Sequence, residues 1–197
     1  MNGRKEEIRE EESEKKSQSR FAAGFKEIVK FVAISLLIIV PFRMWVAQPF
    51  VVSGASMEPN FLNGDYLIVD ELTYNFREPK RGEIIIFKFP QNTSQFFIKR
   101  IVGLPKETVE ITPDGVYIYN EEKPEGFLLG ERYLYGIKTQ SEKRVEIDEN
   151  EYFVLGDNRL QSFDSRNWGA LGSDYIVGRA WLRLWPINKI GFVEWFK

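Results

Sequence analysis

A serine and a lysine, each in a short distinctive segment, are the residues of this chain best suited to covalent chemistry. Ser56 lies in SGASMEPN, residues 53–60, where a glycine and a proline constrain the backbone near the hydroxyl. Lys99 lies in FIKRIVGLP, residues 97–105. A serine hydroxyl is a weak nucleophile until a nearby base accepts its proton. Taken separately, each residue also has an ordinary explanation, as a turn serine or as a lysine whose stem packs on a sheet.

The composition restricts which base could serve. The chain has 197 residues and contains no histidine and no cysteine. This excludes a Ser-His-Asp triad, a thiolate nucleophile, a histidine-ligated zinc site and a disulfide framework. The formal net charge of -2 gives no electrostatic case for nucleic acid as a partner. The proton of a serine nucleophile must therefore go to an amine, a carboxylate or a phenolate.

Lys99 is the fitting amine. Alternation along a strand places Phe97, Lys99 and Ile101 on the same face, so that the ammonium emerges among apolar neighbours. Desolvation disfavours the charged form, and full burial lowers the pKa of a lysine by roughly 3–5 units. Such an amine can accept the serine proton near pH 7 and later return it to a leaving amine.

The segment GDNRLQSFDSRNWG, residues 156–169, combines turn formers, hydroxyls and charged side chains. Asp164 and Arg166 can form a charge-assisted pair, and the serine hydroxyls can bond to backbone or to a nearby amine. A self-capped surface loop is the simpler alternative. Beside the lysine strand, such a loop would hold its neighbours in position.

The elements that must position these residues are predicted to be strands. Residues 48–197 show alternating or short apolar runs separated by turn sequences such as Pro113-Asp114-Gly115, and residues 126–141 form an irregular excursion. We therefore expect a mainly β fold, with an antiparallel β-sheet catalytic domain. The predicted strands cover residues 65–70, 83–89, 96–102, 115–120, 144–147, 151–155 and 175–185.

The N-terminal part predicts a membrane anchor. Residues 1–27 form a charged tail, and residues 28–47 form an apolar segment of 20 residues, about 30 Å long as a helix and able to cross a bilayer as a single transmembrane helix. No small-x-small cleavage site follows promptly, which favours a retained anchor over a removable signal peptide. Taken alone, the twelve uncharged residues 31–42 would also fit a buried core helix. Lys and Arg precede the segment, whereas residues 48–67 contain neither. The positive-inside bias places the tail in the cytoplasm and residues 48–197 across the membrane.

In order and content, these segments resemble type I signal peptidases, membrane-anchored serine proteases with a Ser/Lys dyad. The resemblance covers nearly the whole chain from the anchor onward. It implies hydrolysis of a peptide bond through an acyl-enzyme, with no metal and no cofactor. The substrates would be secretory preproteins with small side chains at the first and third positions before the cut, at a plasma membrane or an internal one such as a thylakoid. The matching segments are SGASMEPN, GDYLIVDEL, RGEIIIFKFP, FIKRIVGLP and GDNRLQSFDSRNWG.

The resemblance also implies roles for individual residues. Ser56 would be the nucleophile and Lys99 the general base. Ser162 would hydrogen-bond the lysine and orient it. Asp164 and Arg166 would form a supporting ion pair, and Asp157 would stabilise the loop. By matching positions, the walls of the shallow apolar substrate pockets would come from Val52, Met57 and Ile98.

The chain departs from the family pattern at a few positions. Gly54 stands where some members have a serine that helps to hold the oxyanion, so we expect another donor to replace it. Phe97 stands where some members have tyrosine, and Lys106 and Glu107 replace a usual Gly-Asp pair. These changes affect the local turn and the packing around the lysine.

Two other functions are compatible with parts of the sequence. A self-cleaving regulator can also use Ser and Lys on a β fold, but it predicts a DNA-binding helical domain in place of the anchor. A membrane-tethered β binding module without catalytic activity is the other alternative. Cleavage assays of variants substituted at Ser56 or Lys99 distinguish these two alternatives from a signal peptidase.

Overall fold

The computed structural model describes residues 26–37, 47–134, 136, 139 and 142–194. The chain divides into two units, Met1–Trp45 and Val46–Lys197. In the first unit, residues 26–37 are helical. Among the residues so described, no helix has both the length and the apolar character of a membrane span. Most of the expected tail, and residues 38–46 of the expected anchor, lie outside the described residues, and Ala47 opens strand β1.

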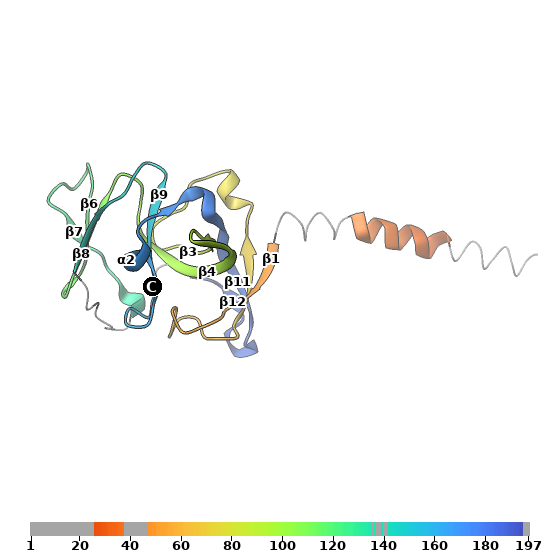
Figure 1. Ribbon diagram of the computed structural model, residues 1–197. Coiled ribbons are helices and arrows are strands. Elements are labelled where there is room, and N and C mark those ends of the chain that lie inside the picture. Colours follow the sequence, from red (N-terminus) through yellow and green to blue (C-terminus); the bar gives the residue numbers. More distant parts are fainter. Residues whose placement is uncertain (1–25, 38–46, 135, 137–138, 140–141, 195–197) are drawn as a thin grey trace, which may run out of the picture. The chain divides into compact units, whose positions relative to one another are not determined.

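The second unit contains two antiparallel sheets (Figure 1). In the larger sheet the strand order is β1-β2-β11-β3-β4-β9-β10, and β12 pairs with β11. Every pairing in this sheet is antiparallel. Its strands are β1 (Ala47–Val51), β2 (Tyr66–Asp70), β3 (Ile84–Phe89), β4 (Asn92–Gly103), β9 (Glu151–Leu155), β10 (Leu171–Gly172), β11 (Ile176–Trp185) and β12 (Gly191–Phe192).

The smaller sheet has the order β7-β6-β5-β8. Its strands are β5 (Thr108–Thr112), β6 (Gly115–Tyr119), β7 (Phe127–Leu128) and β8 (Lys143–Glu146). Short helical turns connect the strands of both sheets: η1 (Thr73–Asn75), η2 (Arg132–Leu134), α2 (Ser165–Trp168), η3 (Ser173–Tyr175) and η4 (Ile187–Lys189).

Strand β3 is buried on both of its faces, which explains its nearly continuous apolar sequence. Ile84 and Ile86 belong to one core cluster, whereas Ile85 and Phe87 belong to another. A strand with period-two side chains can contribute to two clusters only when both faces are covered. The neighbouring strand β4, which carries Lys99, is thereby fixed within the interior of the sheet.

The mainly β, antiparallel class predicted from the sequence is confirmed. All seven predicted strands are present, and the largest boundary difference is at β4, which begins at Asn92 rather than at Phe96. The added residues are polar and exposed, so they gave no apolar alternation to detect. Residues 126–141, expected to be irregular, contain the short β7 and η2.

Two strands of five residues were missed. Strand β1 contains Pro49, a residue that argues against a strand interior. Strand β5 does alternate, with Val109 and Ile111 buried, but it offers only two apolar positions between polar ones. Pairing of β1 with β2 and of β5 with β6 identifies these two segments as strands, whereas their own sequences do so only weakly.

Candidate active site

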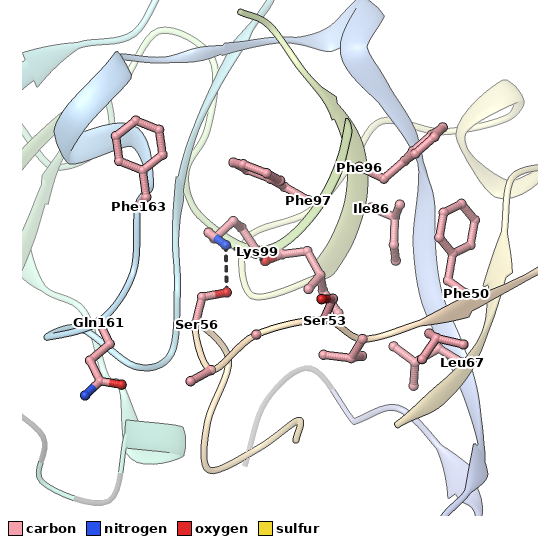
Figure 2. A pocket seen from close by; sticks show the side chains of 15 residues that line it. Phe50, Ser53, Ser56, Leu67, Ile86, Phe96, Phe97, Lys99, Gln161 and Phe163 are labelled. Atoms are coloured by element: carbon pink, nitrogen blue, oxygen red, sulfur yellow. Dashed lines mark hydrogen bonds between the residues drawn. The ribbon is translucent and has the colours of Figure 1, made fainter. Parts of the chain in front are cut away.

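Ser56 and Lys99 meet in the second unit (Figure 2). Lys99 Nζ lies 2.8 Å from Ser56 Oγ and donates a second hydrogen bond, of 2.9 Å, to the carbonyl oxygen of Ile98. Ser56 is in the turn between β1 and β2, and Lys99 is inside β4. The hydroxyl of a turn and the amine of a buried strand are therefore within proton-transfer distance.

The turn that carries Ser56 is fixed at its base. The Val52 N–H donates to the carbonyl of Asp65, and the Gly64 N–H donates to the carbonyl of Val52, at 2.9 and 2.8 Å. Gly54 has a φ of 90°, a conformation that disfavours side chains larger than hydrogen. Its N–H donates to Asn63 Oδ1 at 3.0 Å. The backbone of the turn is thus held from both ends while the Ser56 hydroxyl points toward Lys99.

Lys99 is desolvated, as the alternation along the strand predicted. The residue is 4% exposed, and burial lowers its pKa to about 8, although the charges of Asp164 and Asp157 act in the opposite direction. The Phe97 ring lies 5.3 Å from the nitrogen. Phe97 in turn stacks on Phe89 at 4.7 Å. An amine in these surroundings has a substantial neutral fraction slightly above neutral pH.

The expected ion pair between Asp164 and Arg166 is present. Arg166 Nε lies 2.8 Å from Asp164 Oδ1, and the carboxylate also accepts a hydrogen bond from the Gly156 N–H at 3.0 Å. Asp164 is the N-cap of α2, in a capping box with Asn167. The buried Asp164 carboxylate therefore links Gly156, at the start of the loop, to Arg166, near its end.

Asp157 lies at the centre of a buried network whose other members the sequence did not reveal. Its carboxylate accepts hydrogen bonds from Arg100 at 2.7 and 2.8 Å, and both side chains are buried. Asn60 donates to the same carboxylate at 2.8 Å and to the carbonyl of Tyr133 at 2.9 Å. The network connects the loop, β4 and the turn of the nucleophile. Because its members are far apart in the chain, no local pattern indicates them.

The expected hydrogen bond between Ser162 and Lys99 is not formed. Ser162 Oγ is buried and has no hydrogen-bond partner in the part of the chain that the structure describes. The side chain packs instead against Gly156, where an added Cβ would lie 2.2 Å from the hydroxyl oxygen. The acceptors that orient the amine are Ser56 Oγ and the Ile98 carbonyl.

A cavity of about 300 Å³ opens beside the two residues. Val52 and Ile98 line it, as expected of substrate-contacting residues. Met57 does not: it is completely buried and packs in the core with Phe61 and Leu67. A residue directly after the nucleophile was expected at the cavity wall, but the turn directs its side chain into the sheet. The side-chain donors among the lining residues are Ser53, Ser56, Lys99 and Gln161.

Across the described ranges, no group of Asp or Glu side chains is arranged to hold a metal ion. The arrangement is suited to acyl transfer, since it combines an alcohol, a buried amine and an adjoining apolar cavity.

The chain matches known proteins along most of its length. The family model for "Signal peptidase, peptidase S26" matches residues 25–185. A Synechocystis sp. protein named "Probable signal peptidase I-2" is 32% identical over 187 residues, which are 92% of this chain and 83% of that protein. "Signal peptidase I T" of Bacillus subtilis is 34% identical over 191 residues, 91% of this chain and 93% of that protein.

A plant protein is also similar. "Thylakoidal processing peptidase 1, chloroplastic" of Arabidopsis thaliana is 34% identical over 170 residues, 81% of this chain and 48% of that protein. Together with the family match over residues 25–185, these relatives place the chain: it belongs to the signal peptidase family, peptidase S26.

Proposed function

We propose that the protein is an endopeptidase that removes signal peptides from exported preproteins, with Ser56 as nucleophile and Lys99 as general base. The observation that carries this proposal is the 2.8 Å contact between Ser56 Oγ and the amine of a lysine that is almost completely buried. The names of the relatives, signal peptidase I among them, supply the substrate class.

In the first half of the reaction, Lys99 in its neutral form takes the Ser56 proton as Oγ attacks the carbonyl carbon of the scissile bond. Collapse of the tetrahedral intermediate breaks the C–N bond, and the ammonium returns its proton to the departing amine. In the second half, a water molecule attacks the acyl-enzyme while Lys99 again accepts a proton. Ser56 recovers its hydrogen, so the catalyst is unchanged.

The oxyanion of the intermediate requires hydrogen-bond donors beside Ser56. Within the described residues, the backbone N–H of Ser56 donates no hydrogen bond and is free to bind the oxyanion. For the second donor, which Gly54 cannot supply through a side chain, we propose the Ser53 hydroxyl. Ser53 lies in the same turn and lines the same cavity. The Gly54 N–H is already bound to Asn63.

The cavity supports selection of small side chains before the cut. Val52 and Ile98 contribute apolar side chains to its walls. A shallow apolar pocket accepts a small side chain and excludes a large one by overlap. An extended substrate can in addition be held through its backbone at the neighbouring strand.

We further propose that the apolar segment expected at residues 28–47 anchors the protein in a bacterial plasma membrane or in a thylakoid-type membrane, with its end moved to residue 46 because Ala47 opens strand β1. Residues 1–27 would lie in the cytoplasm and residues 47–197 on the other side. The charge asymmetry around the apolar segment and the names of the relatives support this arrangement. Protease added outside sealed cells should then digest the second unit and spare the tail. The reverse pattern would contradict the orientation.

The decisive experiment uses the full chain in detergent with a preprotein as substrate. Ser56→Ala and Lys99→Ala should each abolish cleavage, whereas Ser94→Ala and Lys88→Ala replace exposed residues outside the cavity and should cleave like the parent. Parent-like cleavage by either dyad variant would overturn the assignment. Cleavage only of the chain itself would favour the self-cleaving regulator, and no cleavage by the parent would favour the binding module.

A further inference from the structure

The cavity beside Ser56 extends to both sides of the reacting pair (Figure 2). On one side of Ser56 and Lys99 lie Phe50, Phe96, Leu67 and Ile86. Phe163 and Gln161 lie on the opposite side, and both come from the loop of residues 156–169. A peptide bound across Ser56 must therefore contact different residues before and after the bond that is cut.

The chemistry identifies which side receives the released chain. Lys99 must donate a proton to the leaving amine, so that amine has to come within hydrogen-bond distance of Nζ. The nitrogen lies near the Phe97 ring, Phe97 stacks on Phe89, and Phe163 packs edge-to-face on Phe89 with ring centroids 5.9 Å apart. Ring contacts thus lead from the amine through Phe97 and Phe89 to Phe163. The side of the cavity with Phe163 and Gln161 is therefore the side on which we place the released chain.

The Phe163 side chain is only partly buried. Its exposed fraction is 50%, while one side of the ring is held by Phe89. A ring that is fixed on one side and open on the other offers a rigid apolar surface at little cost in side-chain entropy. The neighbouring Gln161 is exposed as well, and its amide can both donate and accept hydrogen bonds.

We propose that Phe163 and Gln161 form a subsite for the first two residues of the released chain. Phe163 contacts an apolar side chain there, and Gln161 bonds to the backbone of the released chain. This proposal rests on the proposed function. It adds a substrate preference: preproteins whose mature part begins with an apolar residue are cut faster than those that begin with an acidic one. An acidic side chain would lose hydration against the ring, and the ring offers it no hydrogen-bond donor in exchange.

The test compares preproteins that are identical up to the cut and carry Leu or Asp at the first or the second position after it. For the parent we expect kcat/KM to favour Leu by about tenfold at one or both positions, the range of an apolar contact in a pocket. In Phe163→Ser the preference should fall to about twofold or less, and Phe163→Leu should keep most of it. In Gln161→Ala we expect KM to rise for all substrates, with the preference unchanged.

Phe96→Ser is the matched control, because Phe96 is 47% exposed and lines the same cavity on the other side of Ser56. It should change selectivity for residues before the cut and leave the Leu-to-Asp ratio after the cut unchanged. Phe76→Ser removes a ring that is 86% exposed and outside the cavity, and should change neither.

The outcomes separate the subsite from the proposed function. Equal Leu-to-Asp ratios in the parent and in Phe163→Ser, with cleavage intact, would overturn the subsite alone. Loss of the ratio in Phe96→Ser but not in Phe163→Ser would place the released chain on the other side of the cavity and overturn it too. If the parent cleaves none of the preproteins, it is the proposed function that fails. Should Phe163→Ser unfold, the same comparison is made between the parent and Phe163→Ala.

Discussion

Gly156 lies directly against the backbone of Ser56. A methyl group built on Gly156 would be 2.4 Å from the Ser56 carbonyl oxygen and 2.2 Å from Ser162 Oγ. The same carbonyl accepts a hydrogen bond of 3.0 Å from the Asn158 N–H. The loop of residues 156–169 therefore supports the nucleophile through backbone contact, at a point where only hydrogen fits.

Gly156→Ala should disable the site. Because the methyl group meets a backbone atom that cannot move aside, the turn of Ser56 must shift, and misplacement of a nucleophile by about 1 Å can lower kcat on the order of a hundredfold. Overpacking of this kind also costs about 1–3 kcal/mol of stability. Kinetic assays measure the loss in kcat, and thermal unfolding measures the loss in stability. Gly130→Ala is the matched control, since nothing lies within 4 Å of its added Cβ. A Gly156→Ala enzyme with parental kcat would contradict the contact.

The rate should depend on pH through Lys99. The amine acts as a base only when neutral, so kcat/KM should rise with pH through the pKa of about 8 that burial produces. Asp164 raises this pKa through its charge, and Asp164→Asn should therefore move the rise to lower pH. A pH-rate profile for parent and variant checks both directions. A flat profile between about pH 6 and 10, or a shift of the variant to higher pH, would argue against an amine base.

Lys99→Met should stabilise the protein at neutral pH while it abolishes activity. The pKa of Lys99 is lowered from 10.5 to about 8, so the unfolded state binds more protons between these values, and the stability of the parent rises with pH in that window. Below about pH 8, protonation of the buried Lys99 lowers the free energy of unfolding of the parent by on the order of 3 kcal/mol. Lys99→Met lacks this penalty. The difference in melting temperature between variant and parent should be largest below pH 8 and shrink toward pH 10.5. A difference that stays constant over this range would show that Lys99 is not desolvated.

Asp157→Asn should destabilise the protein strongly. The substitution leaves Arg100 buried, with its charge no longer opposed by the carboxylate that it contacts at 2.7 and 2.8 Å. Breaking a buried pair in this way costs about 3–5 kcal/mol. Urea unfolding should show the loss. Glu149→Gln is the control, because its ion pair with Lys106 is exposed and should contribute little.

Ser53→Ala tests the second oxyanion donor. Removal of a donor that acts only in the transition state should lower kcat about a hundredfold to a thousandfold and leave KM unchanged. Ser53→Thr, which keeps the hydroxyl, should restore part of the rate. An unchanged kcat in Ser53→Ala would exclude the hydroxyl as a donor and leave the Ser56 N–H to act with another group.

Much of the site was predictable because its chemistry is carried by neighbouring residues in the sequence. The alternation around Lys99 predicted an amine among apolar groups, and the spacing of Asp164 and Arg166 predicted an ion pair within one loop. The absence of histidine and cysteine left few possible bases. Strand positions followed from apolar alternation wherever a strand had enough apolar residues to show it.

What escaped prediction depends on contacts between distant segments. Met57 directly follows the nucleophile in the sequence, yet its burial is decided by packing against Phe61 and Leu67. Ser162 was expected to reach the amine, but contact with Gly156 holds its hydroxyl elsewhere. Asn60 and Arg100 converge on Asp157 from other elements. The periodicity of apolar residues along the sequence does not indicate such contacts, because each contact depends on how whole strands pack against one another.

The hydroxyl, the amine and the loop that supports them come from three stretches about forty to sixty residues apart, and strand β9 must pair with β4 before the loop can reach Ser56. A chain still emerging from the ribosome thus holds a serine and a lysine that cannot yet react. The site is therefore complete only after residues 156–169 have been made and β9 has paired with β4.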